Sequence, residues 1–287
     1  MVSPTATEDY VTSAVSQAVS ESLLAYCPSG IFLEIGGHNT NGTKCLDKGD
    51  TAWMLVATAF VLMMTVPGLG LFYGGMVREK NVLSVLMQMF SITALISFLW
   101  LCFGYSLAFG PASGKDVDWP YHKNKIIGDS SRFWFNGMNS NSAHVLAPSV
   151  PETVFCTYQL TFAIITCALI SGSFADRMKF GSMLVFMGLW HILVYCPIAH
   201  WNWHPNGFLN MAGVMDFAGG NVVHISSGIA GLMSSIVVGN RNGFGVDKFP
   251  PHNILYSMTG AALLWVGWFG FNAGINSISV IPPNKAL

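Results

Sequence analysis

The residues best suited to chemistry are an acidic residue and a histidine eight positions apart, Asp216 and His224. Asp216 precedes an apolar run, where a carboxylate accepts hydrogen bonds from the first amides of a helix and complements its dipole. We therefore expect Asp216 to be chiefly structural. A helix that begins at Asp216 would place His224 roughly 12 Å along its axis. There, His224 is either a satisfied core residue or a group that handles protons, and the small residues around it leave room for a lined passage.

Other histidines offer alternatives. His200 and His204 are four residues apart, a spacing that can place two imidazoles on one metal ion, but a proline follows at once and we expect no metal site. His191 and His224 could ligate a haem group, although no further ligand motif accompanies them. We assign no role to His252.

Two tryptophans, Trp201 and Trp203, end an apolar run. Tryptophan is enriched where membrane helices meet the aqueous interface. A tryptophan face also holds a cation, which is worth ~0.5–2 kcal/mol depending on desolvation. The residues alone leave both interpretations open.

The elements that must position these residues are membrane helices. Of 287 residues, 52% are hydrophobic and 9% are charged, about a third of the charged share of soluble domains. The net charge of −1 gives no reason to expect a nucleic-acid partner. Six apolar runs are long enough to cross a hydrocarbon layer of ~30 Å. They cover residues 52–77, 82–109, 153–175, 181–201, 217–239 and 254–276.

Loop charge predicts the orientation of these spans. The loops after the first, third and fifth spans are short and basic, whereas segments 1–50, 110–152 and 202–216 are longer and hold most acidic residues. The positive-inside rule places the basic loops in the cytoplasm and the N-terminus outside. The basic residues are Arg78, Lys80, Arg177, Lys179, Arg241 and Lys248.

The N-terminal segment has two features of an extracellular chain. Asn41 begins an N-glycosylation sequon, and Cys27 and Cys45 could form a disulfide. An unused sequon and two free thiols remain equally open. The other cysteines lie in predicted spans, where we expect them to pack: Cys102, Cys156, Cys167 and Cys196.

Four motifs, in order along the chain, resemble those of the ammonium transporter family (Amt/Mep/Rh), on its Amt side. They are Pro67–Ser84, Gly104–Gly110, Asp216–His224 and Gly267–Gly274. The resemblance covers about residues 50–276 and implies an all-α, polytopic membrane helix bundle that stops after about six of eleven transmembrane helices. The expected division is an extracellular segment 1–50, a partial transmembrane domain 51–276 and a tail 277–287.

The resemblance also implies roles at a site. Trp203 matches a tryptophan that recruits ammonium by cation–π attraction, and Tyr158 and Phe162 match the aromatic positions beside it. Phe162 and Phe271 match two stacked phenylalanines that gate the pore. His224 matches the first of two hydrogen-bonded histidines that line the conduit.

Asp216 matches an acidic residue that chiefly supports the structure around this site. Two departures from the family pattern stand out. Ile275 occupies a position where many relatives carry a serine, so we expect one hydrogen bond to the recruited ion to be lost. The chain also stops before the second pore histidine, and a lone His224 in a half-pore is not expected to conduct.

The expected function is transport of ammonium or ammonia by a multi-pass plasma-membrane homotrimer, without cofactor and without enzymatic activity. Crossing an apolar conduit as an ion is expensive, so separating ammonia from its proton lowers the cost. A second hypothesis is a truncated, non-conducting relative that senses ammonium or modulates intact subunits. A third, a haem or metal oxidoreductase, rests only on the histidines.

Overall fold

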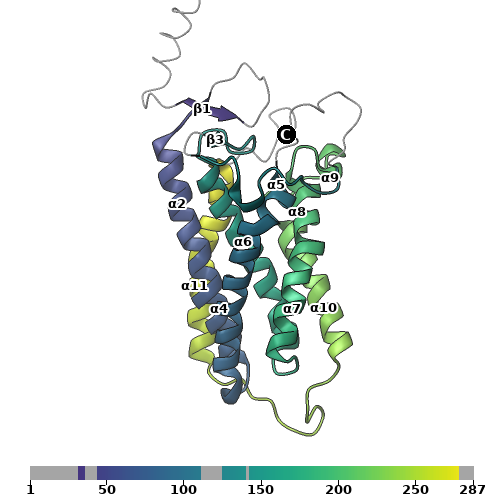
Figure 1. Ribbon diagram of the computed structural model, residues 1–287. Coiled ribbons are helices and arrows are strands. Elements are labelled where there is room, and N and C mark those ends of the chain that lie inside the picture. The colour runs from purple at the N-terminus through teal and green to yellow at the C-terminus, as the bar shows by residue number, and fades with distance from the viewer. Residues whose placement is uncertain (1–31, 36–43, 111–124, 140–141, 278–287) are drawn as a thin grey trace, which may run out of the picture.

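The computed structural model describes residues 32–35, 44–110, 125–139 and 142–277. Within these residues, six helical segments are long and apolar enough to cross a membrane, and they stand side by side in one bundle (Figure 1). The expected all-α membrane bundle with six spans is confirmed. The spans are Lys48–Met76, Glu79–Phe109, Glu152–Phe174, Phe180–Met211, Gly220–Val238 and Ile254–Ala273.

Most spans combine several helical elements, of which those marked η are 3-10 or π helices. In chain order the helices are α2 (Lys48–Met63), η1 (Met64–Leu69), α3 (Gly70–Met76), η2 (Glu79–Asn81), α4 (Val82–Leu99), η3 (Trp100–Gly104), α5 (Tyr105–Phe109), η4 (Phe133–Phe135), α6 (Glu152–Phe174), α7 (Phe180–Trp190), η5 (His191–Tyr195), α8 (Cys196–Trp203), α9 (Phe208–Met211), η6 (Gly220–Ile225), α10 (Ser226–Val238), α11 (Ile254–Ala273) and η7 (Gly274–Ser277). In η1, Pro67 has no backbone N–H, so the regular α-helical hydrogen-bond ladder is interrupted within the span.

The centre of the bundle is α6. In its most apolar stretch 72% of the residues are buried, against 22–44% in the other spans. It packs against α2, α4 and α10, while those helices turn exposed apolar side chains such as Leu83 and Val237 outward. An apolar outer surface around a buried central helix is the arrangement expected in lipid.

The sixth span returns to the first. α11 packs along α2, η1 and α3, although about 180 residues of chain separate them. A Cβ atom at Gly267 would overlap the Met64 side chain, so only glycine permits this close approach. The packing brings Phe271 on α11 next to α6.

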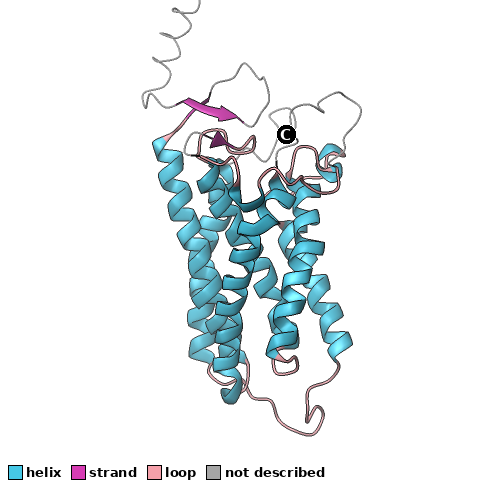
Figure 2. Ribbon diagram, viewed as in Figure 1, coloured by secondary structure: helices cyan, strands magenta, loops and turns pink. Residues whose placement is uncertain are grey.

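A small sheet lies over one end of the bundle, which we call the sheet end (Figure 2). β1 (Phe32–Ile35) pairs antiparallel with β2 (Lys44–Cys45) and parallel with β3 (Ser142–Ala143), in the order β2-β1-β3. Cys27 and Asn41 lie outside the described residues. The four cysteines of the spans are buried free thiols.

Several span boundaries differ from the prediction by a few residues, as at Lys48 in the first span, and two of the differences affect the candidate site. The fourth span continues as helix to Trp203, two residues beyond the expected end, so Trp203 is the last residue of α8. The fifth begins at Gly220 instead of residue 217. His224 is therefore the fifth residue of a π-helical turn, and the expectation that the helix begins at Asp216, on which the estimated rise rested, was wrong.

Candidate functional site

Four aromatic side chains from α6, α8 and α11 meet in the part of the bundle nearer the sheet end. Phe162 lies at their centre. Its ring centroid is 5.0 Å from that of Tyr158 and 5.7 Å from that of Trp203, both in edge-to-face geometry. On its other side it stacks on Phe271, with centroids 4.3 Å apart and planes 29° apart. All four are at most 1% exposed, so the cluster is closed.

Hydrogen bonds fix two members of this cluster. The Tyr158 hydroxyl donates towards the carbonyls of Gly270 and Phe271, at 3.0 and 2.9 Å, and so ties α6 to the end of α11. The Trp203 indole N–H donates to the carbonyl of Asp216, at 3.2 Å. A buried donor that loses its acceptor carries a large free-energy penalty, so these hydrogen bonds hold both rings in place.

Asp216 organises the start of the fifth helix. Its Oδ1 accepts from the amides of Gly219 and Gly220, both at 2.7 Å, and its Oδ2 from those of Asn221 and Val222, both at 3.0 Å. One carboxylate thus satisfies four amides that a helix start leaves unpaired. Gly219 has a φ of +93°, a left-handed conformation that favours glycine. This turn is why the helix begins at Gly220.

His224 lies beyond the aromatic cluster on an exposed face of η6. Its ring centroid is 6.2 Å from those of Trp268 and Phe271, with the imidazole nearly parallel to Trp268. Among the described residues, its imidazole has no hydrogen-bond partner. Because Phe271 also stacks on Phe162, rings follow one another continuously from Trp203 to His224. The structure therefore brings together the residues that the sequence singled out.

Sequence reasoning missed a neighbour of Trp203. Phe109 at the end of α5 stacks on it, with ring centroids 6.2 Å apart and planes 14° apart. Phe109 belongs to the motif at residues 104–110, and its place in this motif is the sequence feature that could have identified it as a site residue. Asn221 likewise donates to the side chain of Asn202 at 3.1 Å, which joins the fifth helix to α8.

A buried ion pair beside the cluster was also missed. Arg132 donates to both carboxylate oxygens of Glu152, at 2.9 and 3.2 Å, and Tyr105 donates to Glu152 at 3.1 Å. Glu152 is 1% exposed and begins α6. Arg132 lies in a loop without periodicity or motif, so nothing in the sequence pointed to this contact.

Three histidines gather at the sheet end. His200 and His204 stack with centroids 4.5 Å apart, and His144 lies 6.2 Å from His204. The Leu146 amide donates to Nδ1 of His144, so its Nε2 carries the proton and donates to the Phe109 carbonyl at 3.0 Å. Burial lowers the pKa of His144 to about 4, against the opposing effect of Glu152.

The weaker histidine hypotheses gain no support from geometry. The described part of the chain contains no group of three or more His, Cys, Asp or Glu side chains that could hold a metal ion. His191, the suggested haem partner of His224, instead stacks on Tyr195 and lies 5.9 Å from the Trp100 ring. His224 lies against Trp268 and Phe271, so the two histidines have no aromatic neighbour in common within the ranges that the structure describes.

Comparison with known proteins identifies the family and the fold. Residues 52–280 match the model of the Ammonium Transporter Family. An ammonium transporter of Mycobacterium tuberculosis is 47% identical over 250 residues, which cover 79% of this chain and 50% of that relative. An ammonium transporter of Bacillus subtilis is 46% identical over 229 residues, which cover 80% of this chain and 53% of that relative.

The crystal structure of Saccharomyces cerevisiae Mep2 superposes with a TM-score of 0.72 at 35% identity, covering 87% of this chain and 56% of that one. The chain spans about half the length of the curated relatives it matches. The match over four fifths of the chain, together with the shared fold, is sufficient for assignment. The chain belongs to the ammonium transporter family.

Proposed function

We propose that this chain forms the mouth and the first part of the conduit of a transporter that carries ammonium or ammonia across a membrane. The supporting observation is the continuous series of rings from Trp203 through Phe162 and Phe271 to His224. The relatives described above are named ammonium transporters, so the alternative of a non-conducting sensor or modulator is not favoured.

The mouth selects a cation. The Trp203 ring attracts ammonium through its quadrupole, and Tyr158 and Phe162 extend the aromatic wall. Ile275 is 1% exposed and has no hydroxyl, so the ion receives no hydrogen bond from that position. The Tyr158 hydroxyl is committed to backbone carbonyls. Aromatic faces therefore supply most of the recruitment energy.

Phe162 and Phe271 form the gate. Rings stacked at 4.3 Å and shielded from solvent leave no space for an ion between them. Rotation of one or both rings opens the path. Asp216 has a structural role, because all four of its hydrogen bonds to backbone amides build the helix start and its carbonyl holds Trp203.

His224 receives the substrate beyond the gate. An apolar passage penalises a charged ammonium strongly, whereas neutral ammonia crosses at much lower cost. An imidazole without a hydrogen-bond partner of its own is available to accept a proton or to hydrogen-bond ammonia. The family resemblance implies that a second histidine, outside this chain, faces it and completes the conduit.

The membrane placement belongs to the same proposal. The basic loops lie in the cytoplasm, the N-terminus and the small sheet lie outside, and the membrane is the plasma membrane. The functional assembly is a homotrimer.

Growth on limiting ammonium tests this function. Cells that lack their own ammonium uptake and express the protein that carries this chain should grow on limiting ammonium, and Trp203→Ala or His224→Ala should reduce that growth. Trp201→Ala is a matched control, because Trp201 lies two residues away and contacts Phe208 instead of the ring series. Absence of growth from membrane-inserted protein would refute the proposal.

A further inference from the structure

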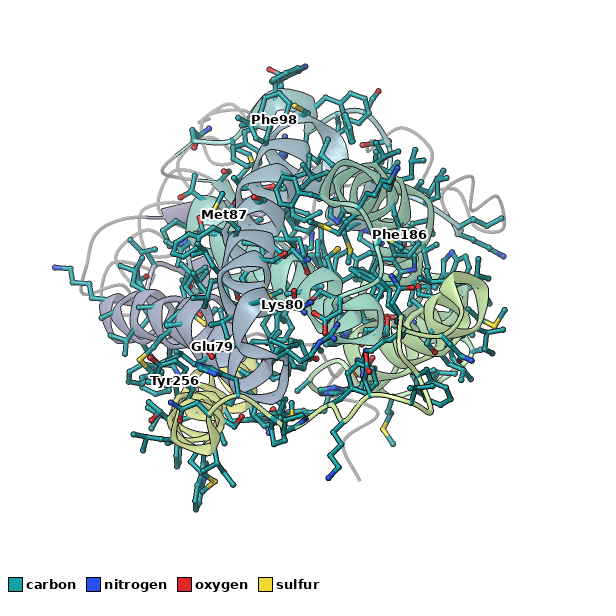
Figure 3. All side chains as sticks on the ribbon, turned by 90° about the horizontal axis from the view of Figure 1, so that it is seen from below. Glu79, Lys80, Met87, Phe98, Phe186 and Tyr256 are labelled. Atoms are coloured by element: carbon teal, nitrogen blue, oxygen red, sulfur yellow. The ribbon has the colours of Figure 1, made fainter. Side chains whose placement is uncertain are left out.

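A cavity of about 360 Å³ opens at the end of the bundle opposite the sheet, which we call the basic end. Its polar lining comes from three connections that are far apart in sequence: Arg78 after the first span, Asp176 after the third and Arg241 after the fifth. Tyr73 and Phe249 add aromatic walls. Figure 3 views the molecule from this end, with Lys80 near the centre of the view and Glu79 beside it.

The arginines of this cavity are not fully used by the protein. The Arg78 guanidinium carbon lies over the Phe249 ring, 4.9 Å from its centroid, a cation–π contact that uses none of the N–H donors as a conventional hydrogen bond. Its nearest carboxylate oxygen, on Asp176, is 3.9 Å away, too far for a hydrogen bond. Among the described residues of this cavity, the Nε atoms of Arg78 and Arg241 and the Oδ1 atom of Asp176 are buried without a hydrogen-bond partner.

A neighbouring arginine provides a contrast. Arg177 donates to the carbonyls of Gly239 and Ser173 and so joins the ends of α10 and α6. Its Nε atom is also buried without a hydrogen-bond partner, but its two terminal nitrogens have a structural task within the protein. The two arginines that line the cavity have no comparable set of acceptors, and buried donors without acceptors call for a missing water or ion.

The charge at this end favours an anion. Around the cavity, two guanidinium groups face one carboxylate, Asp176, whose side chain is 4% exposed. The surrounding connections add three exposed lysines, Lys80, Lys179 and Lys248, against two exposed carboxylates, Glu79 and Asp247, so the positive charge still predominates. The planar fork of arginine matches the oxygens of a phosphate group, which it binds with two parallel hydrogen bonds. The ends of membrane spans also lie at the depth of lipid phosphates.

We propose that this cavity binds a phosphate group, held between Arg78 and Arg241, and that Asp176 limits its affinity by like-charge repulsion. The phosphate comes either from an anionic lipid headgroup or from free phosphate. The inference goes beyond the proposed transport function and does not depend on it, because binding to the purified chain is the readout.

Two binding measurements separate the sources. In the first, inorganic phosphate is titrated calorimetrically into the chain in a neutral detergent at constant ionic strength. In the second, native mass spectrometry counts phosphatidic acid bound from mixed micelles, with phosphatidylcholine as the reference lipid. Saturable binding of inorganic phosphate alone indicates that the ligand is free phosphate. Saturable binding of phosphatidic acid alone indicates a lipid headgroup. Binding of both indicates that the cavity recognises the phosphate group that they share. Absence of saturable binding in both overturns the proposal.

Variants locate the site. Arg78→Gln and Arg241→Gln should each weaken binding about tenfold, the effect of losing one charge-assisted hydrogen bond. Asp176→Asn should tighten binding, a gain that misfolding cannot produce. Lys179→Gln, which removes an exposed charge from the same end but outside the cavity, should leave affinity within about twofold. If the arginine variants behave like Lys179→Gln, or if Asp176→Asn weakens binding, the site is wrong.

Discussion

The aromatic mouth and the face that carries His224 differ in how completely this chain builds them. At the mouth, Phe162 is surrounded by rings, and hydrogen bonds to backbone carbonyls hold its neighbours Tyr158 and Trp203. His224 is exposed, and its two aromatic neighbours, Trp268 and Phe271, both come from α11. Core packing fixes the mouth, whereas the chemistry of His224 depends on groups that face it from elsewhere. Substitutions should therefore lower the free energy of unfolding more at the mouth than at His224.

The largest effect should follow from breaking the ion pair beside the mouth. Arg132→Met leaves the buried Glu152 without its ionic partner and with only the Tyr105 hydroxyl as a donor, which should lower the free energy of unfolding by about 3–5 kcal/mol. Chemical unfolding in detergent measures this loss. The double variant Arg132→Met with Glu152→Leu should recover most of the stability, because no charge remains buried. A loss below about 1 kcal/mol in the single variant would show that packing alone holds this region.

The next largest effect concerns the start of the fifth helix. Asp216→Ala removes the acceptor for four backbone amides and should cost about 2–3 kcal/mol. Asn221→Ala is the control in the same turn, since it removes a single side-chain hydrogen bond and should cost about 1 kcal/mol. Equal losses in the two variants would contradict the structural role of Asp216.

Acid should lower the free energy of unfolding because of His144, which is buried at the sheet end. Its pKa is lowered from 6.5 to about 4 by burial, so the unfolded chain binds a proton that the folded chain excludes. Stability is fully present above pH 6.5 and falls by roughly 1.4 kcal/mol per pH unit down to pH 4. A plot of the free energy of unfolding against pH should have a shallower slope for His144→Gln than for the unmodified protein across this range. An unchanged slope would mean that His144 takes up its proton without unfolding.

The smallest effect on stability should be at His224. Its side chain is exposed and its imidazole makes no hydrogen bond, so His224→Ala should change the free energy of unfolding by less than about 0.5 kcal/mol. Phe271→Ala, one ring away but 1% exposed, should cost about 3 kcal/mol or more. A loss at His224 as large as that at Phe271 would remove the distinction between the two regions.

Much of this architecture was predictable because the membrane imposes simple rules. Span length indicated six helices and four motifs indicated the family, whereas the orientation predicted from loop charge remains a proposal. The roles of Trp203, Phe162 and Phe271 came from the resemblance alone, and they remain proposals. Their mutual contacts could not be derived from the sequence, since they depend on how α6, α8 and α11 cross.

The remaining features depend on tertiary contacts that leave no periodic pattern. The fifth helix starts three residues later than expected because Asp216 and the left-handed Gly219 form a turn before it. The partner of Glu152 comes from a loop 20 residues away, where Arg132 resembled any surface charge. The cavity arginines were recognised only as evidence for orientation, since nothing in their spacing shows that Arg78 and Arg241 line one cavity.

Ammonium-evoked current in a voltage-clamped cell that expresses the protein carrying this chain tests the central claim most directly. If Trp203 recruits the ion and His224 acts in the conduit, the two variants should fail differently. Trp203→Ala should raise the half-saturating ammonium concentration about tenfold while preserving the maximal current, because one cation–π contact is lost. His224→Ala should lower the maximal current and leave half-saturation unchanged. Currents from both variants that match the unmodified protein in amplitude and half-saturation would contradict the account.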